Sequence, residues 1–140
     1  MTSADTQDQV RALRRQLQSL LENAQANERK LDRFDALERR LVAVESMEEL
    51  VNLLLVDCRA DFGLDAAELW LVDLDGELQR ALPALPMVKA PRLLDSHAPL
   101  KEVFGAVRNS RLIGPGHEEA VLAAAFGAGT PIRSAALLPL

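Results

Sequence analysis

The residue types that most often carry chemistry are sparse in this chain and do not form a catalytic set. His97 and His117 lie 20 residues apart, and neither has cysteine or carboxylate neighbours at the spacing of a metal site. Asp95 near His97 and Glu118 beside His117 are the residue types of helix caps and surface pairs. The sequence therefore predicts no metal centre.

The sequence also lacks the motifs of an activated nucleophile and of a phosphate-binding loop. Cys58, the single cysteine, lies on an apolar helical face without a charged motif that would stabilise a thiolate, so it is expected to be a buried structural thiol. Ser134 falls in an apolar stretch with no base nearby. The glycine pairs at 114–116 and 127–129 lack the Lys-Ser/Thr sequence of a phosphate loop, and the Asp-Phe-Gly triplet at 61–63 has no accompanying kinase motif. We expect no catalytic residues, no enzymatic activity and no cofactor.

The distribution of glycine and proline divides the chain into two parts. All seven glycines and all seven prolines fall between Gly63 and the C-terminus, so residues 1–62 contain neither helix breaker. This asymmetry predicts a long helical arm, residues 1–45, followed by a compact mixed domain, residues 46–140.

The arm carries an apolar pattern that alternates in steps of three and four residues. Eight of ten successive positions are apolar, and Asn27 and Glu38 fill the other two. A 3.5-residue repeat of this length is typical of a coiled coil, and a polar Asn27 would fix register and partner number. The expected dimer seam is Val10, Leu13, Leu17, Leu20, Ala24, Asn27, Leu31, Phe34 and Leu41.

Two alternatives remain for the arm. It could fold back as a hairpin on its own domain, although no turn residue marks a bend. Its arginine-rich stretches could suggest a DNA reader, but residues 1–62 carry nine basic against twelve acidic side chains. Such interleaving is typical of a solvated, salt-bridged face. Self-pairing in a homodimer is the favoured hypothesis.

The overall composition argues against nucleic-acid-binding and membrane-spanning classes of protein. Hydrophobic residues make up 49% and charged residues 26%, as in ordinary globular proteins, and the net charge of -5 argues against a nucleic-acid partner. No apolar run is long enough to span a membrane, and the polar N-terminus does not resemble a signal peptide. A cytoplasmic location is expected.

The compact domain opens with a capping-box sequence at residues 46–49, which predicts a helix from Met47 to about Phe62, ended by Gly63. Its expected apolar face is Met47, Leu50, Val51, Leu54, Cys58 and Phe62. A strand at 67–73, a tight turn at Asp75-Gly76 and an antiparallel strand at 77–82 should follow. A helix over 100–107 with Pro99 in its first turn, a strand at 111–113, a helix at 118–126 and a strand at 132–138 complete an α+β fold with a mainly antiparallel sheet.

The order of these elements resembles a GAF domain, a small-molecule sensor fold. The resemblance is greatest at residues 46–51 (SMEELV), 67–73 (AELWLVD) and 132–140 (IRSAALLPL). With residues 27–31 (NERKL) and 34–41 (FDALERRL), the whole chain is similar to the bacterial "domain of unknown function 484" family. That resemblance implies a helical N-terminal segment and a GAF-like fold, with no established activity.

A GAF domain normally continues past the strand at 132–138 into a further strand and a closing helix. The chain is therefore expected either to be shortened or to receive cover from a second copy. A GAF-like pocket would be lined by Trp70 and Phe104, with Arg111 or His117 at its mouth, unless the two aromatic residues are plain core. The chain is thus expected to be a dimeric sensory module that binds an unknown small molecule or protein; the alternative is an interaction scaffold without a ligand.

Overall fold

The computed structural model describes residues 2–106, 109–129 and 131–140. The chain divides into two units, Met1–Ala43 and Val44–Leu140, and each is described by itself. The described part is a mixture of helices and short strands, so the predicted α+β class is confirmed.

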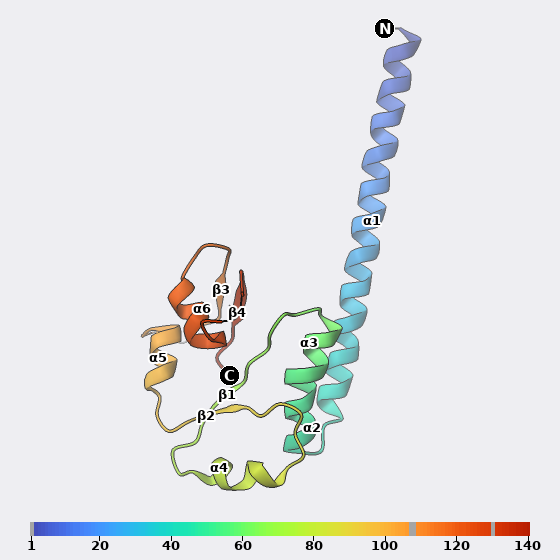
Figure 1. Ribbon diagram of the computed structural model, residues 1–140. Coiled ribbons are helices and arrows are strands. Elements are labelled where there is room, and N and C mark those ends of the chain that lie inside the picture. The colour runs from blue at the N-terminus through green and yellow to red at the C-terminus, as the bar shows by residue number, and fades with distance from the viewer. Residues whose placement is uncertain (1, 107–108, 130) are drawn as a thin grey trace. The chain divides into compact units, whose positions relative to one another are not determined.

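The N-terminal unit is a single uninterrupted helix, α1, Ser3–Val42, of 40 residues (Figure 1). The backbone N–H of Thr2 donates to the Asp5 carboxylate at 3.3 Å, which satisfies one free donor at the helix start. Arg39 and Arg40 lie in the last turn, where cations interact favourably with the helix dipole. The long N-terminal helix is confirmed, and it ends three residues before the predicted residue 45.

The C-terminal unit begins with a helical run in three pieces: α2, Met47–Asn52, a π-helical turn, Leu53–Asp57, and α3, Cys58–Asp61. The Ser46 hydroxyl accepts from the Glu49 N–H at 3.1 Å, so the predicted helix start is confirmed. The Glu49 carboxylate returns to the Glu45 N–H at 2.9 Å, one residue earlier than a capping box would place it. Gly63, at a φ of +62°, follows α3 as predicted.

The π-helical turn corrects the predicted apolar face of this run. Val51, Leu53 and Leu55 are its buried residues, whereas Met47 is exposed and Cys58 is only half-buried. A π-turn accommodates more residues than an α-turn, so the side chains that follow rotate out of the 3.6-residue pattern. The turn therefore accounts for Cys58, which lies after it, whereas Leu53 at its start is buried outside the predicted face.

The predicted β-hairpin at 67–82 is wrong. Strand β1, Trp70–Val72, pairs in parallel with β2, Arg92–Leu94. Residues 77–82 are helical instead, as α4, Glu77–Ala81, and a following 3-10 turn, Leu82–Ala84. The cause lies in Asp73, whose carboxylate accepts the backbone N–H groups of Leu78 at 3.1 Å and Gln79 at 2.9 Å. Side-chain capping satisfies donors that a hairpin would have placed in a strand ladder.

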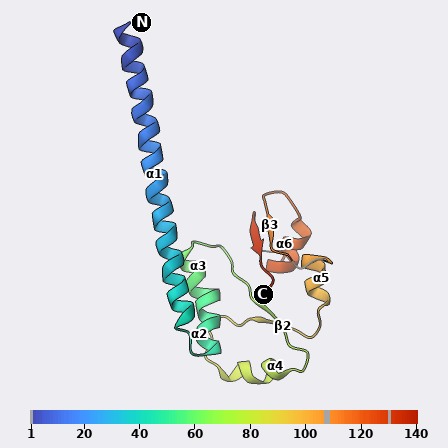
Figure 2. The same cartoon turned by 180° about the vertical axis from the view of Figure 1, so that it is seen from behind.

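The last third of the chain forms a small helix-and-strand cluster. Helix α5, Ala98–Phe104, has Pro99 in its first turn, and α6, Glu119–Phe126, is followed by Gly127. Strand β3, Arg111–Ile113, pairs antiparallel with β4, Ala135–Leu137, which is shorter than predicted. Both views place α5, α6 and β3 next to one another (Figure 1, Figure 2). Val107, expected at the end of the first helix, lies outside the described residues.

This cluster contains a hydrophobic core of the C-terminal unit. Its buried members are Val103, Ile113, Leu122, Ala125 and Leu137. The two strand pairs are separate, one parallel and one antiparallel, in the part of the chain that is described. The prediction of one mainly antiparallel sheet is therefore wrong.

Candidate functional site

The most extensive candidate surface is an exposed apolar stripe along α1. We call it the α1 seam: the ten positions Val10, Leu13, Leu17, Leu20, Ala24, Asn27, Leu31, Phe34, Glu38 and Leu41. The exposed fractions of Leu13, Leu20 and Leu31 are 63%, 66% and 62%. No residue of the helix is buried. Large apolar side chains gathered on one stripe at this exposure mark an interaction surface.

Helix geometry keeps the seam on one side. Steps of three and four residues average 3.5, close to the 3.6 residues of a helical turn, so successive members stay in line. The seam extends over residues 10–41, or about 47 Å at about 1.5 Å per residue. Leu21 and Val42, both exposed, directly follow seam positions and widen the stripe.

Charged and amide groups of α1 interact on the side away from the seam. Arg11 and Asp8 form an ion pair at 3.6 Å, and the Gln18 amide donates to Glu22 at 2.9 Å. None of these four residues occupies a seam position. Both interactions are made within one helix, as expected for a solvated surface.

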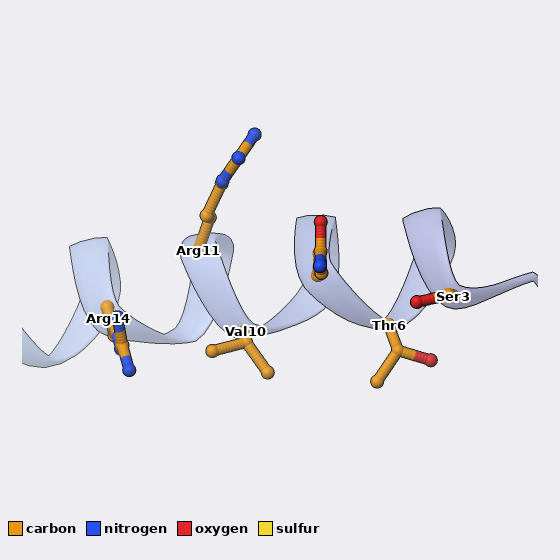
Figure 3. A pocket seen from close by; sticks show the side chains of 6 residues that line it. Ser3, Thr6, Val10, Arg11 and Arg14 are labelled. Atoms are coloured by element: carbon orange, nitrogen blue, oxygen red, sulfur yellow. The ribbon is translucent and has the colours of Figure 1, made fainter.

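Two shallow hollows lie on the surface of α1, and both are too open to enclose a small molecule. One is lined from a single helix by Ser3, Thr6, Gln7, Val10, Arg11 and Arg14. Figure 3 shows Val10 and Arg11 extending to opposite sides of that helix. The other is lined by Asp8, Arg11, Arg14 and Arg15, again from α1 alone. A small-molecule site needs walls on several sides, which these residues do not supply.

The predicted pocket residues Trp70 and Phe104 pack against the hydrophobic core of the C-terminal unit. Arg92 covers the Trp70 ring, with its guanidinium carbon 4.7 Å from the ring centroid. Both aromatic side chains are partly buried. These contacts favour the alternative in which the two residues belong to the core.

The two polar residues expected at the pocket mouth have different surroundings. The Arg111 guanidinium donates to the Val103 carbonyl oxygen and forms an ion pair with Glu118. His117 is exposed, and its backbone N–H donates to the Gly114 carbonyl at 3.3 Å. Arg111 thus ties β3 to α5 and to the start of α6, while His117 lies in the turn between the strand and that helix.

A second exposed apolar surface, outside the predicted site residues, lies on the β3–β4 pair. Leu112 faces Ala136 across the ladder, and both are exposed, as is Leu138 after β4. Their neighbours Ile113 and Leu137 are buried on the opposite face. The alternation of side chains along a strand is the sequence feature that could have separated these two faces.

Other site chemistry is not assembled in the described residues. Within residues 2–106, 109–129 and 131–140, no three His, Cys, Asp or Glu side chains come together as a metal site. No helix in the same ranges combines the length and hydropathy needed to cross a membrane. Comparison of the chain with protein-family models, curated proteins and solved structures gives no match in any of the three.

Proposed function

We propose that the chain is a non-enzymatic regulatory module that assembles as a homodimer through α1. The observation that carries this proposal is the α1 seam, in which apolar side chains at a 3.5-residue spacing remain exposed along a 40-residue helix. Fully burying a leucine contributes about 1.5–3 kcal/mol. The pairing of two such seams therefore has a substantial driving force.

A second copy of the same helix is the partner that the seam fits. Two helices interlock along a 3.5-residue repeat only when both carry it, and homo-oligomers with two-fold symmetry are the commonest assemblies. Asn27, in the middle of the seam, favours pairings that give its amide a polar environment. The acidic net charge of -5 supports a protein partner over a nucleic acid.

The C-terminal unit would act as a GAF-like domain in this proposal. Support comes from its α+β composition and from the confirmed elements near residues 47, 111–113 and 119–126. Its regulatory role would be to bind a small molecule or protein and thereby favour one relative pose of the paired helices. A cytoplasmic location belongs to the same proposal.

A scaffold without a small-molecule ligand is a second candidate, and a specific observation favours it. Trp70 and Phe104 pack against the hydrophobic core. Arg111 donates to the Val103 carbonyl oxygen and forms an ion pair with Glu118. A ligand at these residues would have to replace those contacts. In the scaffold version, the paired helices position two C-terminal units for a protein partner.

Native mass spectrometry of freshly purified full-length chain tests both versions. A dimer that retains an additional small mass supports the sensor. A dimer without added mass, whose melting temperature does not rise with any member of a metabolite panel, supports the scaffold, since a ligand that binds the folded state must raise stability. A monomer at micromolar concentration contradicts both versions.

A further inference from the structure

We infer that the two copies of α1 pair antiparallel, with Val10 of one helix opposite the partner's Leu41. This inference rests on the homodimer proposed above and adds its direction and register. It is carried by three charged residues, Arg14, Asp35 and Glu38, whose places relative to the α1 seam are fixed by the helix. Two directions are available to paired helices, and these charges distinguish between them.

Glu38 disfavours the parallel arrangement. In a parallel pair in register, each seam residue faces its own copy, so Glu38 would face the partner's Glu38 between layers of Phe34 and Leu41. Two carboxylates brought together in an apolar seam repel each other and lose hydration. In the antiparallel pair Glu38 faces the partner's Leu13, and the two Glu38 residues are about 37 Å apart along the axis at about 1.5 Å per residue.

The antiparallel register also matches side chains of different size. Full overlap of the ten seam positions gives five kinds of layer, each occurring twice. They are Val10 with Leu41, Leu13 with Glu38, Leu17 with Phe34, Leu20 with Leu31, and Ala24 with Asn27. The largest residue, Phe34, then faces a leucine, and Ala24 and Asn27 form the two central layers. The two Asn27 residues lie in adjacent layers, about 4.5 Å apart along the axis at about 1.5 Å per residue, so each amide has a polar neighbour. A parallel pair would instead stack Phe34 on Phe34 and Ala24 on Ala24, which fills the seam less evenly.

The residues that flank the seam supply charge complementarity. Arg14 directly follows Leu13, and Asp35 directly follows Phe34, so both occupy the same edge of the seam. In the antiparallel register Arg14 lies beside the partner's Asp35, and the two-fold axis repeats the pair. Among the described residues, neither side chain takes part in an ion pair within its own helix. Both charges are therefore available to a partner.

In the parallel alternative Asp35 has a different neighbour on the partner helix, so mutations can distinguish the two directions. There, Asp35 would lie beside the partner's Lys30, while Arg14 would lie beside Gln9. Lys30 and Asp35 are five residues apart and do not face each other on one helix, so a coupling between them would also report a contact between chains. The charge that compensates a change at Asp35 identifies the direction.

Charge exchange in the full-length chain is the first test. Asp35→Arg should weaken dimerisation about tenfold by placing like charges together. Addition of Arg14→Asp should restore the dissociation constant to within about threefold of wild type, and the matched addition of Lys30→Asp should not. Rescue by Lys30→Asp, or rescue by neither change, overturns the inference.

Cysteine cross-linking is the second test and keeps direction separate from dimerisation. In a Cys58→Ala background, Leu13→Cys and Glu38→Cys chains are prepared separately, one with an affinity tag, and are then mixed and oxidised. The expected result is a disulfide-linked heterodimer from the mixture and no cross-link from either variant alone. Self-linking of Leu13→Cys overturns the antiparallel direction while the dimer stands. A monomeric mass for the unmodified chain overturns the dimer itself.

Discussion

The guanidinium group of Arg92 lies over the indole ring of Trp70, 4.7 Å from its centroid, and the two residues are direct partners in the parallel pairing of β1 with β2. Arg92 also donates through Nη1 to the Ala124 carbonyl oxygen of α6 at 3.4 Å. One side chain therefore covers the only tryptophan and links β2 to the helix of the core cluster. This arrangement makes Trp70 part of the packing of the C-terminal unit.

Arg92→Ala should lower the free energy of unfolding by about 0.5–1 kcal/mol, the usual contribution of a cation over an aromatic ring at an exposed site. Urea denaturation followed by tryptophan fluorescence measures this change directly, since Trp70 is the only tryptophan. Arg133→Ala, at an exposed position, is the matched control and should be nearly neutral. Equal effects of the two variants would show that the Arg92–Trp70 contact contributes nothing.

Asp73→Ala should cost about 1–2 kcal/mol of stability, because it removes the carboxylate that accepts from Leu78 and Gln79 at the start of α4. Thermal and urea unfolding give the magnitude. Asp75→Ala removes a neighbouring carboxylate without this role and should cost less than about 0.5 kcal/mol. The reverse order of the two effects would contradict the helical start and favour the hairpin.

Leu122→Ala should destabilise the C-terminal unit by about 2–5 kcal/mol, the usual cost of a cavity in a packed core. Leu122 is 6% exposed, whereas Leu112 on the outer face of β3 is 89% exposed. Leu112→Ala is therefore the matched control and should change stability by about 0.5 kcal/mol or less. A large cost at Leu112, measured by urea denaturation, would show that a partner covers the outer face of the β3–β4 pair.

Features determined by neighbours in the chain could be predicted from the sequence. The continuity of α1 follows from an unbroken repeat without glycine or proline, and its end lies shortly before the Ser46 cap of the next helix. The start of α2 follows from the Ser46 cap, and the end of α3 from Gly63, because both signals act within one helical turn.

Features determined by distant or competing contacts could not be predicted from the sequence. Trp70 pairs with Arg92, which is 22 residues away, and no local pattern indicates that partner. Asp75-Gly76 is a typical hairpin turn. However, the Asp73 carboxylate accepts the backbone N–H groups of Leu78 and Gln79, which stabilises a helix in the following segment. The π-turn at Leu53–Asp57 similarly shifts the buried face in a way that a 3.6-residue pattern does not express.

For the candidate site, the sequence predicted the exposed stripe of α1 but not the surroundings of the expected pocket residues. Spacing alone identifies a stripe because the helix repeats regularly. Whether Trp70 lines a cavity or packs in a core depends on side chains from β2, α5 and α6, and their positions follow from tertiary packing.

Glu38→Leu should tighten the homodimer by about tenfold or more, since it replaces a charge in the α1 seam with a side chain that gains from burial. Sedimentation equilibrium gives the dissociation constant. Glu22→Leu makes the same replacement on the side of α1 away from the seam and is the matched control. Equal tightening by both variants would show nonspecific association and would contradict the seam assignment.

In the proposed dimer α1 holds two copies of the chain together, and light scattering coupled to size exclusion chromatography measures the mass of the assembly. The wild-type chain should elute with twice its 15.3 kDa mass. Leu17→Asp and Leu31→Asp should each elute as a monomer, while Ala36→Asp, on the opposite side of α1, should remain a dimer. A wild-type monomer would show that no dimer forms, and variants at Leu17 and Leu31 that keep the dimer mass would show that α1 does not hold the dimer together.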